Sequence, residues 1–150
     1  MKQVRSFATP EAAEAAFYQA MAEADYAGMQ GVWAAMDEIV CVHPGGPRLT
    51  GASVLESWRA IFSRGRGIPA TPQAVHRLQT DELAVHSLLE LVPKGDGSGY
   101  YPPVIVTNVY RRTESGWRMV LHHAHMNPRP ENEGGEVHED TAEKPGPRLH

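Results

Sequence analysis

The chain has 150 residues, of which 41% are hydrophobic and 21% are charged, and its formal net charge is -4 at pH 7. This length predicts a single domain, and the hydrophobic fraction is sufficient for a packed core, which excludes a chain disordered throughout. The mild acidity disfavours a nucleic-acid-binding protein, because such a protein needs a basic face. We therefore expect one globular domain that has no nucleic acid among its partners.

The single cysteine, Cys41, restricts the chemistry that the chain can carry. One thiol forms no internal disulfide and no multi-cysteine zinc site. Cys41 lies in the apolar run Ile39–Val42, which favours a small core side chain over a nucleophile. No apolar stretch approaches the length of a membrane span, and residues 1–9 lack the apolar segment of a signal peptide. We expect a cytoplasmic protein with no membrane partner.

Three segments in the first half of the chain have the periodicity of helices. The first begins at the capping residue Thr9 and carries apolar residues at three- and four-residue spacing as far as Ala24. Asp25 is placed to cap a second helix, whose apolar stripe ends at Trp33. A third helix is predicted over residues 53–62.

Strands are predicted between and after these helices. A short strand over residues 39–43 ends at the turn Pro44–Pro47, and the period then changes from about 3.6 to 2. The four strands predicted in succession cover residues 71–79, 82–92, 104–112 and 117–125. Helices grouped against a mostly antiparallel sheet define the α+β class.

The last part of the chain differs in composition. Residues 128–150 are rich in Pro, Gly, Glu, Asn and His and contain few apolar residues. This composition predicts a flexible C-terminal tail, with the folded domain confined to residues 1–127.

Two segments carry a family resemblance. The first is Val42–Gly51, which begins Val-His-Pro-Gly-Gly-Pro and is followed by Trp58 and Phe62. It resembles a segment of bacterial SnoaL-like proteins. Gly116–Ala124 resembles the last strand of the same group, within the nuclear transport factor 2-like superfamily. The resemblance covers about residues 9–127 and implies three helices on a curved, cystatin-like cone that holds a pocket. It also implies a homodimer, but it leaves the activity open, because this fold hosts isomerases, cyclases, dehydratases, hydrolases and plain binding modules.

The ketosteroid isomerases of this superfamily provide a sharper comparison. Their catalytic Asp-Pro pair corresponds to His43-Pro44 in this chain, so an imidazole replaces the carboxylate. The tyrosine and the protonated aspartate of their oxyanion hole correspond to Phe17 and Asn108. These replacements argue against steroid isomerisation by the same mechanism.

Strand alternation selects the other candidate site residues. If Trp117, Met119 and Leu121 face the helices, His123 and His125 share that face and His122 points outward. His43 is the candidate acid or base, because an imidazole titrates near neutral pH, and His123 with Asn108 would polarise a carbonyl oxygen. The residues expected to line the pocket are Phe17, Trp58, Leu121, Tyr110 and His125.

Three functions remain open on these residues. The first is cofactor-free proton transfer, of the isomerase, cyclase or dehydratase type, on a small apolar carbonyl-bearing ligand. The second is a non-catalytic ligand-binding or homodimeric interaction module, with Val120, Ala124 and Met126 on the dimer face. The third is a metal site formed by His43, His123 and His125. We expect no cofactor, and the sequence does not identify the ligand.

Overall fold

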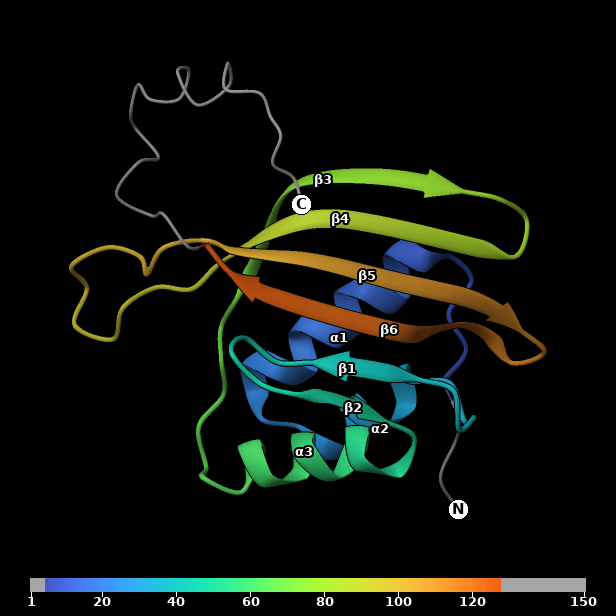
Figure 1. The fold of residues 1–150 in the computed structure, drawn as a ribbon, viewed down its shortest axis with the longest axis horizontal. Helices are drawn as coiled ribbons and strands as arrows, with labels where there is room; N and C mark the ends of the chain where they lie inside the picture. Colours follow the sequence, from blue (N-terminus) through green and yellow to red (C-terminus); the bar gives the residue numbers. More distant parts are fainter. Residues whose placement is uncertain (1–4, 128–150) are drawn as a thin grey trace.

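The computed structural model describes residues 5–127, which form three helices and six strands in the order α1–α2–β1–β2–α3–β3–β4–β5–β6 (Figure 1). The predicted tail, residues 128–150, lies outside the described residues. Within the part that is described, no helix is long and apolar enough to cross a membrane.

The three helices begin and end close to the predicted positions. In α1 (Pro10–Glu23), the Thr9 hydroxyl oxygen accepts a hydrogen bond from the Ala12 amide at 3.0 Å, which satisfies one of the free N–H groups of the first turn. In α2 (Tyr26–Val32), the Asp25 carboxylate accepts from the amide of Gly28 in the same way. The third helix, α3 (Ala52–Phe62), differs from the prediction by one residue.

Six strands form one mixed sheet in the order β2-β1-β6-β5-β4-β3. Every neighbouring pair is antiparallel except β1 and β6, which are parallel. The strands are β1 (Val40–Val42), β2 (Arg48–Thr50), β3 (Thr71–Gln79), β4 (Leu83–Leu91), β5 (Val104–Thr113) and β6 (Gly116–Met126). Strand β2 was not predicted, because three residues are too few for an alternation to be recognised.

The helices and the sheet enclose the core on one side of the sheet only. Helix α1 crosses behind β5 and β6 as drawn in Figure 1, with α2 and α3 next to β1 and β2, and no helix lies in front of β4, β5 and β6. Phe17 of α1, Trp58 of α3 and Met119 of β6 are all at least 98% buried between these layers. The predicted α+β class and the mostly antiparallel sheet are therefore confirmed.

A β-bulge in β6 changes which of its side chains face the core. Tyr110 of β5 pairs with Met119, but the preceding Val109 pairs with Leu121, so Val120 is an additional residue without a partner. An extra residue reverses the alternation of inward and outward side chains beyond it. Up to the bulge, Trp117 and Met119 are buried, as expected.

Beyond the bulge the observed orientation is the opposite of the predicted one. His122 and Ala124 are buried against the helices, whereas His123 and His125 are exposed. The prediction that Leu121, His123 and His125 face the pocket is therefore wrong, and so is the prediction that His122 and Ala124 lie on the outer face.

Candidate functional site

A network of polar side chains lies between α1 and the inner face of the sheet. Each of its seven members is no more than 6% exposed, and hydrogen bonds connect all of them. The residues of this buried polar network are Glu14, Tyr18, His86, Glu90, Asn108, Tyr110 and His122. Polar groups removed from water are stable only when they have hydrogen-bond partners, so each member depends on the others.

The secondary structure explains why these residues converge. Glu14 and Tyr18 are four residues apart in α1 and therefore share one helix face. On the sheet, His86 of β4, Asn108 of β5 and His122 of β6 are directly paired across three neighbouring strands, so their side chains point to the same face.

Glu14 is the main acceptor of the network. Its Oε2 accepts from the Tyr110 hydroxyl at 2.9 Å, from His86 Nδ1 at 3.0 Å and, at 3.4 Å, from Asn108 Nδ2. Burial by itself raises the pKa of Glu14, but the hydrogen bond and the charge of His86, together with the bonds from Tyr110 and Asn108, hold that pKa below its usual value. Glu14 is therefore ionised at neutral pH.

Glu90 behaves in the opposite way. The Tyr18 hydroxyl donates to Glu90 Oε2 at 2.7 Å and accepts from Asn108 Nδ2 at 3.1 Å. Burial raises the pKa of Glu90 to about 7; the Tyr18 hydrogen bond opposes this change and the negative charge of Glu14 adds to it. The network thus pairs one ionised carboxylate with one that exchanges its proton near neutral pH, which is the combination that acid–base chemistry uses.

Asn108 joins these carboxylates to His122. The Asn108 amide nitrogen is directed at Tyr18 and Glu14, so its Oδ1 faces His122 Nδ1 at 2.7 Å and accepts from it. The hydrogen of the neutral imidazole therefore lies on Nδ1, and Nε2 carries the lone pair. Burial lowers the pKa of His122 to about 3, with smaller contributions from the charges of His43 and His123. This imidazole is therefore neutral.

Aromatic rings connect His122 to His43 at the end of β1. The His122 ring lies 4.9 Å from that of Phe17 and 6.1 Å from that of Trp58, measured between centroids. His43 meets Trp58 edge-on at 4.7 Å, and its Nε2 lies 2.8 Å from Ser57 Oγ. Because the Ser57 hydroxyl donates to the Val54 carbonyl, it accepts from His43 Nε2, which leaves Nδ1 of His43 as the basic nitrogen. Burial lowers the pKa of His43.

Cys41 is adjacent to this site but does not add a nucleophile. It is fully buried, and its sulfur lies 3.8 Å from His43 Nε2. Burial raises the pKa of the Cys41 thiol to about 12, so almost none of it is thiolate at neutral pH. The interpretation of Cys41 as a core residue is confirmed.

The structure brings together some of the predicted site residues and separates the others. Phe17, Trp58, Asn108 and Tyr110 are buried together beneath α1, with His43 at their edge. Leu121, His123 and His125 lie on the outer face of the sheet instead. His43 therefore does not meet His123 and His125, and among residues 5–127 no three metal-ligating side chains gather as a metal site would require.

The sequence interpretation missed five members of the network. Two signals were present. Glu14 and Tyr18 lie on both sides of Phe17 in α1, and His86 and Glu90 occupy the same face of β4 as the apolar Ala84 and Leu88. A charged residue at a position that the period assigns to the core indicates a buried polar partner. The missed residues are Glu14, Tyr18, His86, Glu90 and His122.

Helices on one face of a mixed six-stranded sheet, with polar side chains gathered beneath the first helix, define an α+β protein of the cystatin-like kind. The SnoaL-like domain family matches residues 11–126. The chain belongs to this family, within the nuclear transport factor 2-like superfamily. A comparison with curated proteins gave no match.

Two solved structures share substantial sequence identity with the chain. One is a Thiobacillus denitrificans protein assigned as a calcium/calmodulin-dependent protein kinase type II association domain; it is 39% identical with a TM-score of 0.77, and the match covers 82% of this chain and 98% of that one. The other is a Streptomyces avermitilis protein of the NTF2-like family assigned as a dehydratase; it is 32% identical with a TM-score of 0.65, and the match covers 77% of this chain and 91% of that one.

A third solved structure shares the fold only. It is a Shewanella frigidimarina protein assigned as a ketosteroid isomerase, 16% identical with a TM-score of 0.61, and the match covers 75% of this chain and 90% of that one. The two structures of higher identity are thus assigned one to association and one to catalysis, so these similarities select neither function for this chain.

Proposed function

We propose that this chain is a self-associating module that forms a homodimer through the outer face of its sheet. The observation that carries the proposal is a row of aliphatic side chains at directly paired positions on five neighbouring strands. The residues of this aliphatic row, from β3 to β1, are Leu78, Val85, Val109, Leu121 and Val40.

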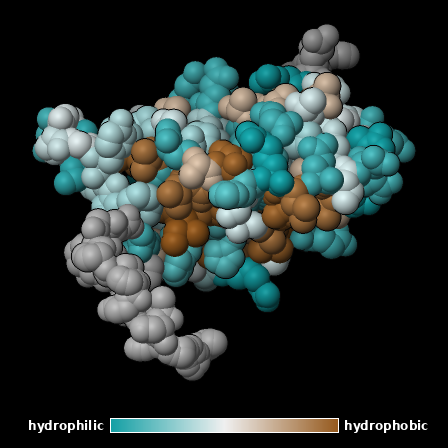
Figure 2. Space-filling model, turned by 90° about the horizontal axis from the view of Figure 1, so that it is seen from above, coloured by the Kyte–Doolittle hydropathy of each residue, from teal (hydrophilic) through white to brown (hydrophobic). Residues whose placement is uncertain are grey.

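The aliphatic row faces away from the helices. Its members alternate along their strands with buried residues such as Cys41, Ala84 and Asn108, so they point to the opposite face. Leu78 is 72% exposed and the other four are half-buried. Figure 2 looks onto the β3 edge of the sheet rather than onto this face, and shows apolar side chains between hydrophilic ones across the middle of that view.

A second copy of the chain is the partner that fits this row. A contiguous apolar surface on a small domain marks an interaction site, and a sheet face can meet its own copy about a two-fold axis with the same residues on both sides. The relative that is 39% identical is assigned as an association domain, which supports self-association for this chain.

The test places a charge at the centre of the aliphatic row. Val109→Asp buries a carboxylate in the proposed interface, whereas Tyr100→Asp changes an exposed loop residue away from it. We expect the unmodified chain and Tyr100→Asp to sediment with twice the 16.5 kDa chain mass, and Val109→Asp to sediment as a folded monomer. A monomeric unmodified chain, or a Val109→Asp protein that still dimerises as tightly, would contradict the proposal.

The buried polar network favours a second function, which is proton transfer on a small apolar carbonyl-bearing ligand. His43 would act as the base through Nδ1. The polarising role that the sequence assigned to His123 and Asn108 would fall to Glu90, because His122 presents only the lone pair of Nε2 and Asn108 donates both amide hydrogens within the network. Glu90, with its pKa raised by burial to about 7, would hold the proton that a carbonyl oxygen needs. The relative assigned as a dehydratase supports a catalytic function of this kind.

Deuterium exchange at the carbon next to a ketone tests this second function directly. The probe is 2-tetralone in D₂O, followed by proton NMR with the unmodified chain, His43→Gln and the surface control Glu56→Gln. We expect the unmodified chain and Glu56→Gln to accelerate exchange above the buffer rate. The His43→Gln protein should lose most of this acceleration. Equal rates for all three proteins, or none above buffer, would exclude His43 as the base for this probe.

A further inference from the structure

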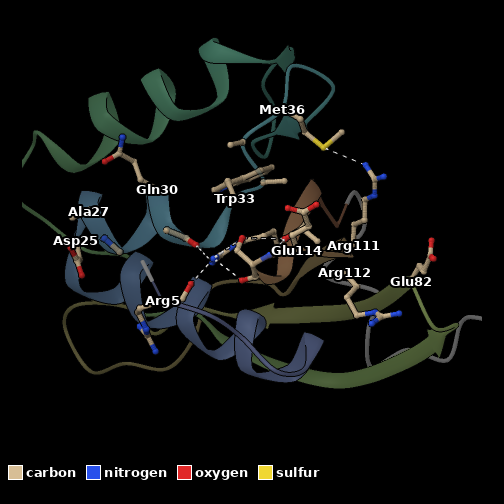
Figure 3. A pocket seen from close by; sticks show the side chains of 17 residues that line it. Arg5, Asp25, Ala27, Gln30, Trp33, Met36, Glu82, Arg111, Arg112 and Glu114 are labelled. Carbon is tan, nitrogen blue, oxygen red and sulfur yellow. Dashed lines mark hydrogen bonds between the residues drawn. The ribbon is translucent and has the colours of Figure 1, made fainter. Parts of the chain in front are cut away.

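An open groove of about 1450 Å³ lies beyond one end of the aliphatic row, because Arg111 in its wall follows Val109 by two positions on the same face of β5. Its walls come from α2 with the following segment Trp33–Met36, from the hairpin between β5 and β6, and from Arg5 near the beginning of the described chain (Figure 3). It shares no residue with the buried polar network or with the aliphatic row.

Four arginines line this groove without a carboxylate partner. They are Arg5, Arg111, Arg112 and Arg118, and the ion pairs found among residues 5–127 include none of them. Three carboxylates, those of Asp25, Glu82 and Glu114, also line the groove, so the local excess of positive charge is small. The four guanidinium groups lie at different places along the groove (Figure 3), and what distinguishes them is that none forms an ion pair among residues 5–127.

Two of these guanidinium groups are already committed to the protein. Arg118 donates to the Gly31 carbonyl at 2.6 Å and to the Ser115 carbonyl at 3.0 Å, which anchors α2 to the hairpin. Arg112 donates from Nε to the Asp81 carbonyl at 2.9 Å. Arg111 is different, because the side-chain hydrogen bond it makes among residues 5–127 runs from Nη1 to the Met36 sulfur at 3.9 Å, and a thioether is a weak acceptor. Arg111 can exchange this contact for an anion.

Trp33 supplies an independent observation. Its side chain lines the groove and is 97% buried, yet its indole Nε1 has no hydrogen-bond partner among the described residues. An indole N–H is a donor only, and leaving it buried without an acceptor is unfavourable. The neighbouring Ala34, Ala35 and Met36 make the same wall apolar.

We propose that this groove binds a small organic carboxylate with an apolar body. The carboxylate accepts from Arg111, where a planar guanidinium matches its two oxygens, and the apolar body lies against Trp33 and Met36. This inference concerns a surface separate from the proposed function and does not depend on it.

The experiment titrates the ¹⁵N-labelled protein with phenylacetate and follows the indole N–H resonances by NMR. The chain has three tryptophans, and Trp33→Phe identifies the relevant resonance by its loss. We expect the Trp33 resonance to shift and saturate with phenylacetate but not with the neutral phenylacetamide. Arg111→Gln should weaken binding by about tenfold or more, whereas Arg77→Gln, which is exposed and outside the groove, should leave it unchanged.

Three outcomes would contradict the proposal. One is the absence of any shift in the Trp33 resonance at about 10 mM phenylacetate, well above the range of specific small-ligand binding. Another is an Arg111→Gln protein that binds phenylacetate as tightly as the unmodified chain while its spectrum shows an intact fold. An equal response to inorganic phosphate would show an unselective anion site and would also contradict the proposed apolar body.

Discussion

Replacing Glu90 by glutamine should make the protein more resistant to unfolding at high pH than the natural chain. The folded state raises the pKa of this carboxyl from the usual 4.5 to about 7, because burial disfavours its charge. The natural chain thus folds with full stability below pH 4.5 and loses stability as the pH rises through 7, since the unfolded state ionises more readily. Glutamine is neutral throughout and keeps the acceptor oxygen for the Tyr18 hydroxyl.

The structure sets the magnitude of this effect. The gap between 4.5 and about 7 corresponds to roughly 3 kcal/mol, at 1.36 kcal/mol for each step of one in pKa. The Glu90→Gln protein should therefore gain roughly 3 kcal/mol relative to the natural chain between pH 4.5 and pH 8. Other titrating groups change both proteins equally, so they cancel in this comparison.

Urea unfolding followed by circular dichroism at pH 4.5 and at pH 8 measures the effect. The matched control is Glu56→Gln, an exposed carboxyl on α3 for which no pH-dependent difference is expected. If the free energies of unfolding of Glu90→Gln and the natural chain differ by the same amount at both pH values, burial of Glu90 does not perturb its ionisation and the reasoning fails.

Three further predictions concern the core and the segment that follows α3. Cys41 should react with a thiol reagent only after unfolding, because it is fully buried and its pKa is raised to about 12; rapid modification of the native protein would show otherwise. Phe17→Ala should lower the free energy of unfolding by roughly 3–5 kcal/mol in urea titrations, since the ring is fully buried among aromatic neighbours, and a loss below about 1 kcal/mol would contradict this packing. Gly67→Ala should lower the free energy of unfolding by roughly 1–3 kcal/mol, because its added Cβ would lie 1.8 Å from the Ala22 carbonyl oxygen. The control is Gly95→Ala, whose added Cβ meets nothing within 4 Å, and equal melting temperatures for the two variants would refute the clash.

Local patterns were sufficient to predict most of the secondary structure. The limits of α1 follow from a capping threonine and a proline in the first turn, and β3 occupies the predicted residues because its boundaries are turns. The sequence could not show which distant residues meet. Glu14 and His86 are 72 positions apart, as are Tyr18 and Glu90, and both contacts depend on how α1 lies across the sheet.

The prediction of which β6 side chains face the helices was wrong for a different reason. Assigning an inner face from the spacing of apolar residues assumes an unbroken alternation of two, and the extra Val120 breaks it. Nothing in the composition of Gly116–Met126 marks that position, because Val120 is itself a good strand residue. One unpaired residue was therefore enough to exchange the buried His122 for the exposed His123 in the predicted site.

Strand β4 departs from the usual relation between hydropathy and burial, and this departure bears on function. Its buried positions alternate between the apolar Ala84 and Leu88 and the polar His86 and Glu90, whereas its outward-facing positions include Leu83, Val85 and Leu89. A lone domain gains nothing from placing its polar residues inside and its aliphatic ones outside, because both arrangements cost free energy in water. The arrangement becomes favourable if a partner covers the outer face and if the inner polar groups are fully hydrogen-bonded. The second condition is met for the buried polar network by the bonds that join its members; among them only His86 Nε2 lacks a hydrogen bond, and it lies 3.8 Å from Glu11 Oε2. The first condition is the one that the proposed homodimer would satisfy.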